Sequence, residues 1–133
     1  MNHKTLSIAL LTLGLAACGT TAPPAVPPST DARVLLGTWS VDLRPQPDAP
    51  PYLQTLVVSS VSAGTFQGRF YNTPITEGRI NTSWGTVRMA FVTADGNGSY
   101  HHSAVLAGGR LEGLSNATAR GFLAYWSAVK SAP

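Results

Sequence analysis

The chain has 133 residues, of which 44% are apolar and 11% charged, and it contains a single cysteine. This length allows one domain, and its three Trp, four Tyr and four Phe are not typical of a disordered chain. One cysteine excludes an internal disulfide and zinc sites built from several thiolates. The nine Lys or Arg and six Asp or Glu lie scattered, without the basic patch that nucleic-acid binding requires. We therefore expect no nucleic-acid partner.

Residues 1–17 have the composition of a secretory signal peptide. A short polar start with Lys4 precedes an apolar run from Leu6 to Leu15. A helix that crosses a membrane takes about 20 apolar residues, and this run is shorter. The run leads into Leu15-Ala16-Ala17-Cys18, which resembles the lipobox of bacterial lipoproteins.

This resemblance implies that Cys18 is lipidated and becomes the acylated N-terminus, with the lipid bilayer of the cell envelope as its partner. Two or more acyl chains are needed for stable anchoring, and a lipoprotein cysteine carries them. In such lipoproteins an Asp after the cysteine retains the protein in the inner membrane, so Gly19 favours the outer membrane. The alternative is an ordinary signal peptide, which would leave Cys18 as a free thiol.

Residues 18–32 are predicted to be an extended tether. Four prolines lie between Pro23 and Pro28, in a stretch with no large apolar side chain except Val26. Such a segment adopts polyproline II, and about twelve residues at its rise would span about 35 Å. A Pro-x-x-Pro recognition site is the alternative interpretation of the same residues.

From residue 33 to residue 130 the pattern is that of a β domain. Apolar and polar residues alternate with the period of two that half-buried strands show, for example at Trp39, Val41 and Leu43. Gly and Asn in the separators supply the positive φ angles of tight hairpins, so consecutive strands should be antiparallel neighbours. The eight predicted strands are residues 38–44, 52–59, 65–71, 77–81, 83–93, 99–107, 110–115 and 119–129.

The expected fold class is all-β, as an antiparallel eight-stranded up-and-down barrel. Short local connections favour this meander, and a closed barrel leaves no edge strand to aggregate. A two-sheet β-sandwich is the alternative. The only longer connection, from Pro45 to Pro51, holds four prolines and should form a stiff loop.

The first strand opens with Leu36-Gly37-Thr38-Trp39, which resembles the Gly-x-Trp opening of the calycins, the lipocalin and avidin-like barrels. In that family the Trp plugs one end of the barrel and a basic residue late in the last strand packs over it. The resemblance implies these roles for Trp39 and Lys130. The chain lacks the disulfide and C-terminal helix that are common in lipocalins.

The sequence predicts no catalytic residues, no metal site and no cofactor. The adjacent residues His101 and His102 face opposite sides of a strand, so they cannot chelate one metal. A Gly-x-Ser-x-Gly nucleophile motif and an obvious carboxylate pair are both absent. We therefore expect that the protein is not an enzyme.

Aromatic residues are the candidate ligand site. If Trp39 points inward, strand alternation places a mostly apolar set on the same side, and this set would suit a small apolar ligand. In the strand 99–107 the face with Ala104 and Leu106 should be the inner one, so His102 should lie inside and titrate below its usual pKa. The predicted ligand-binding residues are Trp39, Phe66, Phe70, Trp84, Tyr100, His102 and Trp126.

Two functions remain open at this stage. The first is an envelope lipoprotein that binds a small apolar ligand inside the barrel. The second is a structural or protein-interaction module with a filled interior, since the side chains of a small barrel can occupy it completely. A cavity of about 300 Å³ or more would favour the first, and an exposed apolar patch over a filled interior the second.

Overall fold

The computed structural model describes residues 19, 22–24 and 29–133. The predicted signal peptide, Cys18 and residues 20–21 and 25–28 of the predicted tether lie outside these residues. The described elements, in chain order, are the 3₁₀ segment η1 (Ala32–Leu35), β1 (Gly37–Asp42), β2 (Leu53–Ser62), β3 (Thr65–Phe70), β4 (Thr73–Pro74), β5 (Thr76–Asn81), β6 (Arg88–Asp95), β7 (Gly98–Ala107), β8 (Arg110–Ala117), the 3₁₀ segment η2 (Thr118–Arg120) and β9 (Phe122–Lys130).

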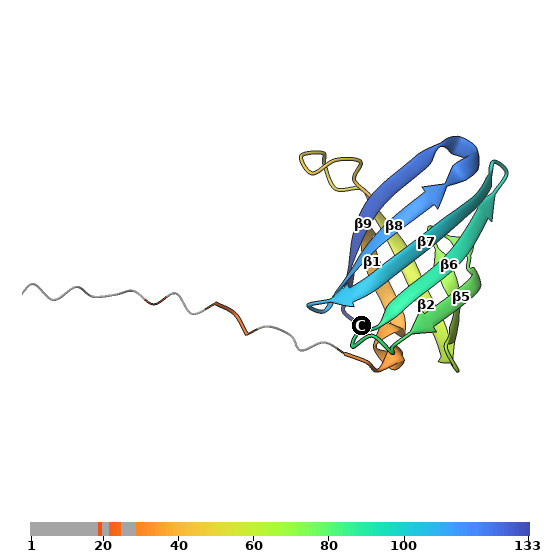
Figure 1. Ribbon diagram of the computed structural model, residues 1–133. Helices are drawn as coiled ribbons and strands as arrows, with labels where there is room; N and C mark the ends of the chain where they lie inside the picture. Colours follow the sequence, from red (N-terminus) through yellow and green to blue (C-terminus); the bar gives the residue numbers. More distant parts are fainter. Residues whose placement is uncertain (1–18, 20–21, 25–28) are drawn as a thin grey trace, which may run out of the picture.

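The strands form a closed antiparallel barrel (Figure 1). From β5 to β9 each strand pairs with the next along the chain, and β9 pairs with β1. The pairings β1–β2, β2–β3 and β3–β5 close the ring, and the two-residue β4 is an additional short strand beside β3. The predicted eight-stranded barrel is therefore confirmed, and the sandwich alternative is wrong.

Hairpin turns set this local connectivity. Gly108 and Gly109, between β7 and β8, have φ angles of 56° and 77°. Two consecutive positive φ angles characterise the tight turns whose twist matches that of paired strands. The resulting register places Leu106 opposite Leu111 and His102 opposite Ser115. On the inner face, an apolar residue therefore pairs with an apolar one, and a polar residue with a polar one.

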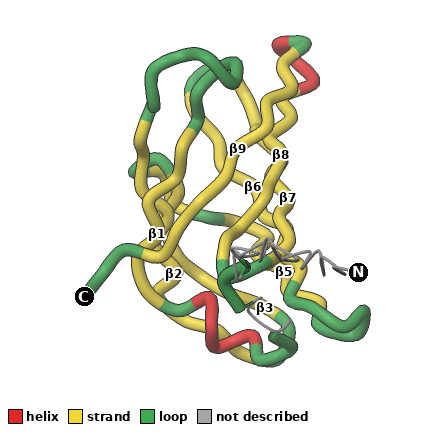
Figure 2. The backbone as a smooth tube through the Cα atoms, turned by 90° about the vertical axis from the view of Figure 1, so that its left-hand side faces the viewer, coloured by secondary structure: helices red, strands yellow, loops and turns green. Residues whose placement is uncertain are grey.

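One end of the barrel, here named the closed end, is filled by side chains around Trp39. Its indole is 1% exposed and donates a hydrogen bond from Nε1 to the carbonyl of Leu35, at 2.8 Å. The Lys130 Nζ lies 5.4 Å from the centre of the Trp39 ring and donates to the Val34 carbonyl, at 2.7 Å. The segment η1 thus lies across this end, while η2 lies at the opposite end (Figure 2).

The core follows from the strand alternation. Buried apolar side chains come from every long strand of the barrel except β5, which contributes the half-buried Ile80. The core residues are Leu35, Trp39, Val41, Leu56, Val58, Phe66, Phe70, Val87, Met89, Phe91, Ala104, Leu106, Leu111, Trp126 and Ala128.

The structure corrects the predicted strand 83–93. Strand β6 begins only at Arg88, because residues before it form a turn in which the Asn81 side chain accepts from the Ser83 N–H and Gly85 has a φ of 75°. Trp84 therefore does not follow the inward–outward alternation of the strand. Its side chain is 71% exposed and packs under the Arg88 guanidinium, so the prediction that Trp84 lines the interior is wrong.

Candidate ligand-binding cavity

The end of the barrel opposite Trp39, here named the mouth, contains a cavity of about 560 Å³. Tyr52, Tyr71 and Phe122 are each more than 40% exposed at its edge, so the cavity opens to solvent. The lining residues come from β3, β4 and β6–β9, from η2, and from the connections next to these strands and between β1 and β2. They are Leu43, Pro45, Tyr52, Phe70, Tyr71, Thr73, Thr93, Ala94, Asp95, Tyr100, His102, Ser115, Arg120, Phe122 and Ala124.

Apart from the exposed Trp84, the predicted aromatic set divides between this cavity and the core. Phe70, Tyr100 and His102 line the cavity. Trp39, Phe66 and Trp126 point inward as predicted, but they are buried in the core and do not line it. The interior is therefore filled at the closed end and hollow at the mouth.

Three buried polar side chains from adjacent strands form the floor of the cavity. His102, on β7, is 5% exposed; its Nδ1 lies 2.7 Å from the Ser115 hydroxyl on β8, and its Nε2 lies 2.9 Å from the Thr93 hydroxyl on β6. Thr93 and Ser115 are themselves at least nine-tenths buried. Both ring nitrogens thus have partners, as a buried imidazole requires.

Aromatic rings pack closely against His102. The Phe91 ring stacks on the imidazole at 4.6 Å between centroids, and the Phe70 ring meets it edge-on at 4.7 Å. Removal from water disfavours the charged imidazole, and the nearby His101 adds a smaller effect, so the pKa of His102 is lowered to about 4. This confirms the predicted direction and makes His102 neutral at physiological pH.

The rim of the cavity carries the charged groups. The Tyr100 hydroxyl donates to Asp95 Oδ2 at 3.0 Å, and the Arg120 guanidinium donates to the same hydroxyl and lies over the Tyr100 ring. The backbone N–H of Asn97 holds the pKa of Asp95 below its usual value, with Tyr100 and Arg120 acting in the same direction. Across the rim, the Tyr52 and Tyr71 hydroxyls share a hydrogen bond that raises the pKa of Tyr71.

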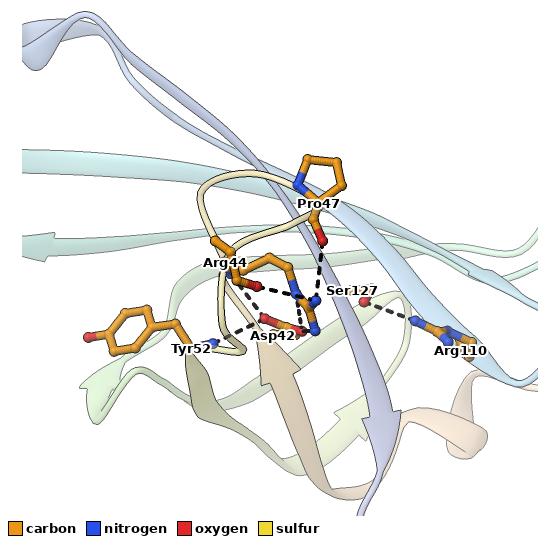
Figure 3. Close-up of polar contacts among 7 residues, drawn as sticks. Asp42, Arg44, Pro47, Tyr52, Arg110 and Ser127 are labelled. Atoms are coloured by element: carbon orange, nitrogen blue, oxygen red, sulfur yellow. Dashed lines mark hydrogen bonds and ion pairs between the residues drawn. The ribbon is translucent and has the colours of Figure 1, made fainter.

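The connection between β1 and β2 borders the mouth and is tied at its base by Asp42 (Figure 3). Asp42 accepts from the backbone N–H of Arg44 at 3.0 Å and that of Tyr52 at 3.3 Å, and it pairs with the Arg44 guanidinium. The Arg44 hydrogen bonds hold the pKa of Asp42 below its usual value. Asp42 thus fixes both ends of the loop that carries Leu43 and Pro45 to the cavity.

Sequence reasoning predicted His102 and Tyr100, but it missed the other two floor residues, Thr93 and Ser115, and much of the rim. Thr93 and Ser115 share the inward parity of Phe91 and Leu111, so alternation alone could have placed them inside. No comparable signal exists for Tyr52, Tyr71 and Arg120, because they lie at strand ends and turns whose positions depend on barrel closure.

The fold and the cavity define a small closed β-barrel that is packed at one end and hollow at the other. No family model, curated protein or solved structure matches the chain. Within residues 19, 22–24 and 29–133, the structure has no helix with the length and apolar character needed to cross a membrane. Over the same residues, no three His, Cys, Asp or Glu side chains gather into a group that could hold a metal ion.

Proposed function

We propose that this chain is a membrane-anchored lipoprotein of the bacterial cell envelope whose barrel binds a small apolar ligand. The mouth cavity is the observation that carries the proposal. Its volume of about 560 Å³ falls within the range of roughly 300–1,000 Å³ that small-molecule sites occupy. Its walls are apolar at Leu43, Phe70 and Phe122, and a few polar groups converge on it. Small-molecule sites usually have this composition.

The position of the N-terminal segment supports the same arrangement. The backbone carbonyl of Ser29 accepts from the N–H of Val87 at 3.1 Å, and Val87 O in turn accepts from Leu106 N at 2.9 Å. Val87 and Leu106 belong to the buried core and, like Trp39, lie away from the cavity. From Ser29 on, the chain therefore joins the barrel without covering the mouth.

Native mass spectrometry of the purified full-length protein, with solvent extraction of bound molecules, tests ligand binding. We expect a small apolar molecule to co-purify with the parent protein. The Ala124→Phe variant, which places a ring in the cavity, should lose it. The Leu123→Phe variant carries the same ring on the outer face, where Leu123 is 69% exposed, and should keep it. Equal retention in both variants would contradict binding in this cavity.

An exposed apolar patch on the outer face favours the second candidate function, a protein-interaction module. Leu114 on β8 lies opposite Tyr125 on β9, and both are about half exposed, next to the exposed Leu123. Apolar side chains that gather on a surface are typical of interaction sites. Crosslinking in intact cells, with Leu114→Ser/Tyr125→Ser as the comparison, tests this candidate; a partner captured equally by both forms would contradict it.

A further inference from the structure

The floor of the cavity has one hydrogen-bond donor more than the described residues use. A neutral imidazole has one N–H donor and one bare nitrogen acceptor. His102 contacts a hydroxyl through each nitrogen, Ser115 through Nδ1 and Thr93 through Nε2. One of these hydroxyls therefore donates to the bare nitrogen, and the other accepts from the N–H.

The hydroxyl that accepts from the N–H keeps its own hydrogen. If Nδ1 carries the proton, this hydroxyl is Ser115; if Nε2 carries it, this hydroxyl is Thr93. Among residues 29–133, neither hydroxyl makes a further hydrogen bond. Both side chains are buried and line the cavity, and a buried donor without an acceptor is costly. In both tautomers, one donor is thus available to the contents of the cavity.

The floor offers this donor without any charge. His102 is neutral because its pKa is lowered to about 4. The other ionisable side chains that line the cavity lie at its rim: Asp95 and Arg120, together with the phenols of Tyr52, Tyr71 and Tyr100. An ionised carboxylate at the floor would lose its hydration with no cation to replace it, which is strongly unfavourable. An uncharged oxygen acceptor meets no such penalty.

We propose that the cavity binds a neutral amphiphile with its polar end inward, so that an uncharged carbonyl, ether or hydroxyl oxygen accepts from the floor. The hydrocarbon body then lies along Leu43, Phe70 and Phe122 towards the mouth. This inference rests on the proposed function, and it adds the class of ligand and its orientation.

Three probes with matched chain length test the proposal on the full-length protein by NMR titration at pH 7. They are 2-octanone, its apolar isostere 2-methyl-1-octene, and octanoate. We expect the ketone to bind about fivefold more tightly than the isostere, the usual effect of one hydrogen bond. Octanoate should bind more weakly than the ketone. The carbonyl stretching frequency of bound 2-octanone should be lower than its value in an alkane solvent.

Variants assign the effect to the floor. The preference for ketone over isostere should fall by about fivefold in at least one of the two single variants, Ser115→Ala and Thr93→Val. Thr73→Val removes a hydroxyl from the rim of the same cavity, and it should leave the preference unchanged. If the floor variants do not fold, the carbonyl frequency and the ligand series on the parent protein decide the question.

The outcomes separate this proposal from the proposed function. Equal binding of ketone and isostere, or an unshifted carbonyl frequency, would overturn the polar-end-inward orientation and leave apolar ligand binding in place. Octanoate binding as tightly as the ketone would overturn the neutral ligand class and assign recognition to Arg120 at the rim. If none of the three probes binds, the proposed function itself is overturned.

Discussion

His102 combines the two properties that distinguish the cavity from an ordinary core. Its ring is packed between Phe70 and Phe91 as an apolar side chain would be. Its nitrogens hold two hydroxyls from the neighbouring strands in place. One side chain therefore fills the interior at this level and makes the floor polar.

Stability should fall as the pH is lowered from 6.5 to 4. In this range the unfolded chain protonates His102, whose usual pKa is 6.5, while the folded protein keeps it neutral. The unfolded state then binds more protons, so the loss reaches about 3 kcal/mol near pH 4. Urea unfolding at a series of pH values measures it.

The His102→Gln variant is the control, since it should lack most of this slope whatever its absolute stability. The pKa values of Asp42 and Asp95 are held low in the folded protein. Their contribution is present above the usual Asp pKa, which is about 3.9, and is lost as the pH falls through their folded values. The loss of stability from these two carboxylates therefore occurs mainly below the pH range in which His102 acts. A flat profile between pH 4 and 6.5 would contradict the buried neutral state.

Among the strands, the contact between β8 and β9 depends on Gly113, which has no side chain. Gly113 lies opposite Trp126, and a Cβ on Gly113 would come within 2.3 Å of the indole. Trp126 is fully buried, and its Nε1 has no hydrogen-bond partner among the described residues. Its contribution is therefore packing, for which Gly113 provides the space.

Gly113→Ala should destabilise the barrel by about 1–3 kcal/mol, the usual effect of overpacking a core. Gly96→Ala is the matched control, because its added Cβ would have no heavy atom within 4 Å and its φ is not in the positive range. Thermal and urea unfolding of the two variants measure the difference. Equal stability would show that the indole moves aside easily.

The closed end joins η1, β1 and β9 through Trp39. We expect Trp39→Ala to be the most destabilising single change in the domain, by about 3–5 kcal/mol, because it empties a buried aromatic site. It also leaves the Leu35 carbonyl without its donor. Tyr52→Ala, at a side chain that is 46% exposed, should shift the urea midpoint much less. Similar shifts of the urea midpoint in the two variants would contradict the role of Trp39 as the plug of the closed end.

At the scale of the whole molecule, the proposed anchor determines where the cavity is presented. Cys18→Ser should leave the protein as unprocessed precursor, because in the proposed lipoprotein this thiol would be the acyl acceptor and lipidation normally precedes cleavage. Labelling cells with a fatty-acid analogue measures this. A Ser variant that is labelled and processed like the parent would contradict the lipoprotein proposal.

Much of the barrel could be predicted from the sequence because its determinants are local. The alternation around Trp39 and His102 specifies which side chains point inward, and turn residues such as Gly108 and Gly109 specify hairpins between consecutive strands. Trp84 shows the limit of this reasoning. The turn around Gly85 interrupts the alternation, so a residue that reads as part of a strand lies outside the barrel.

Alternation in the sequence correctly predicted that Trp39, Phe66, Phe70, His102 and Trp126 point inward, but strand pairing selects which inward residues form a cavity. Thr93, His102 and Ser115 belong to three strands, and they meet because the registers of β6, β7 and β8 align them. The hollow mouth depends on closure of the barrel by β1 and β9, two strands that are distant in the chain. Alternation gives each side chain a direction, but the size of the hollow depends on the long-range pairing of β1 with β9, which no local pattern encodes.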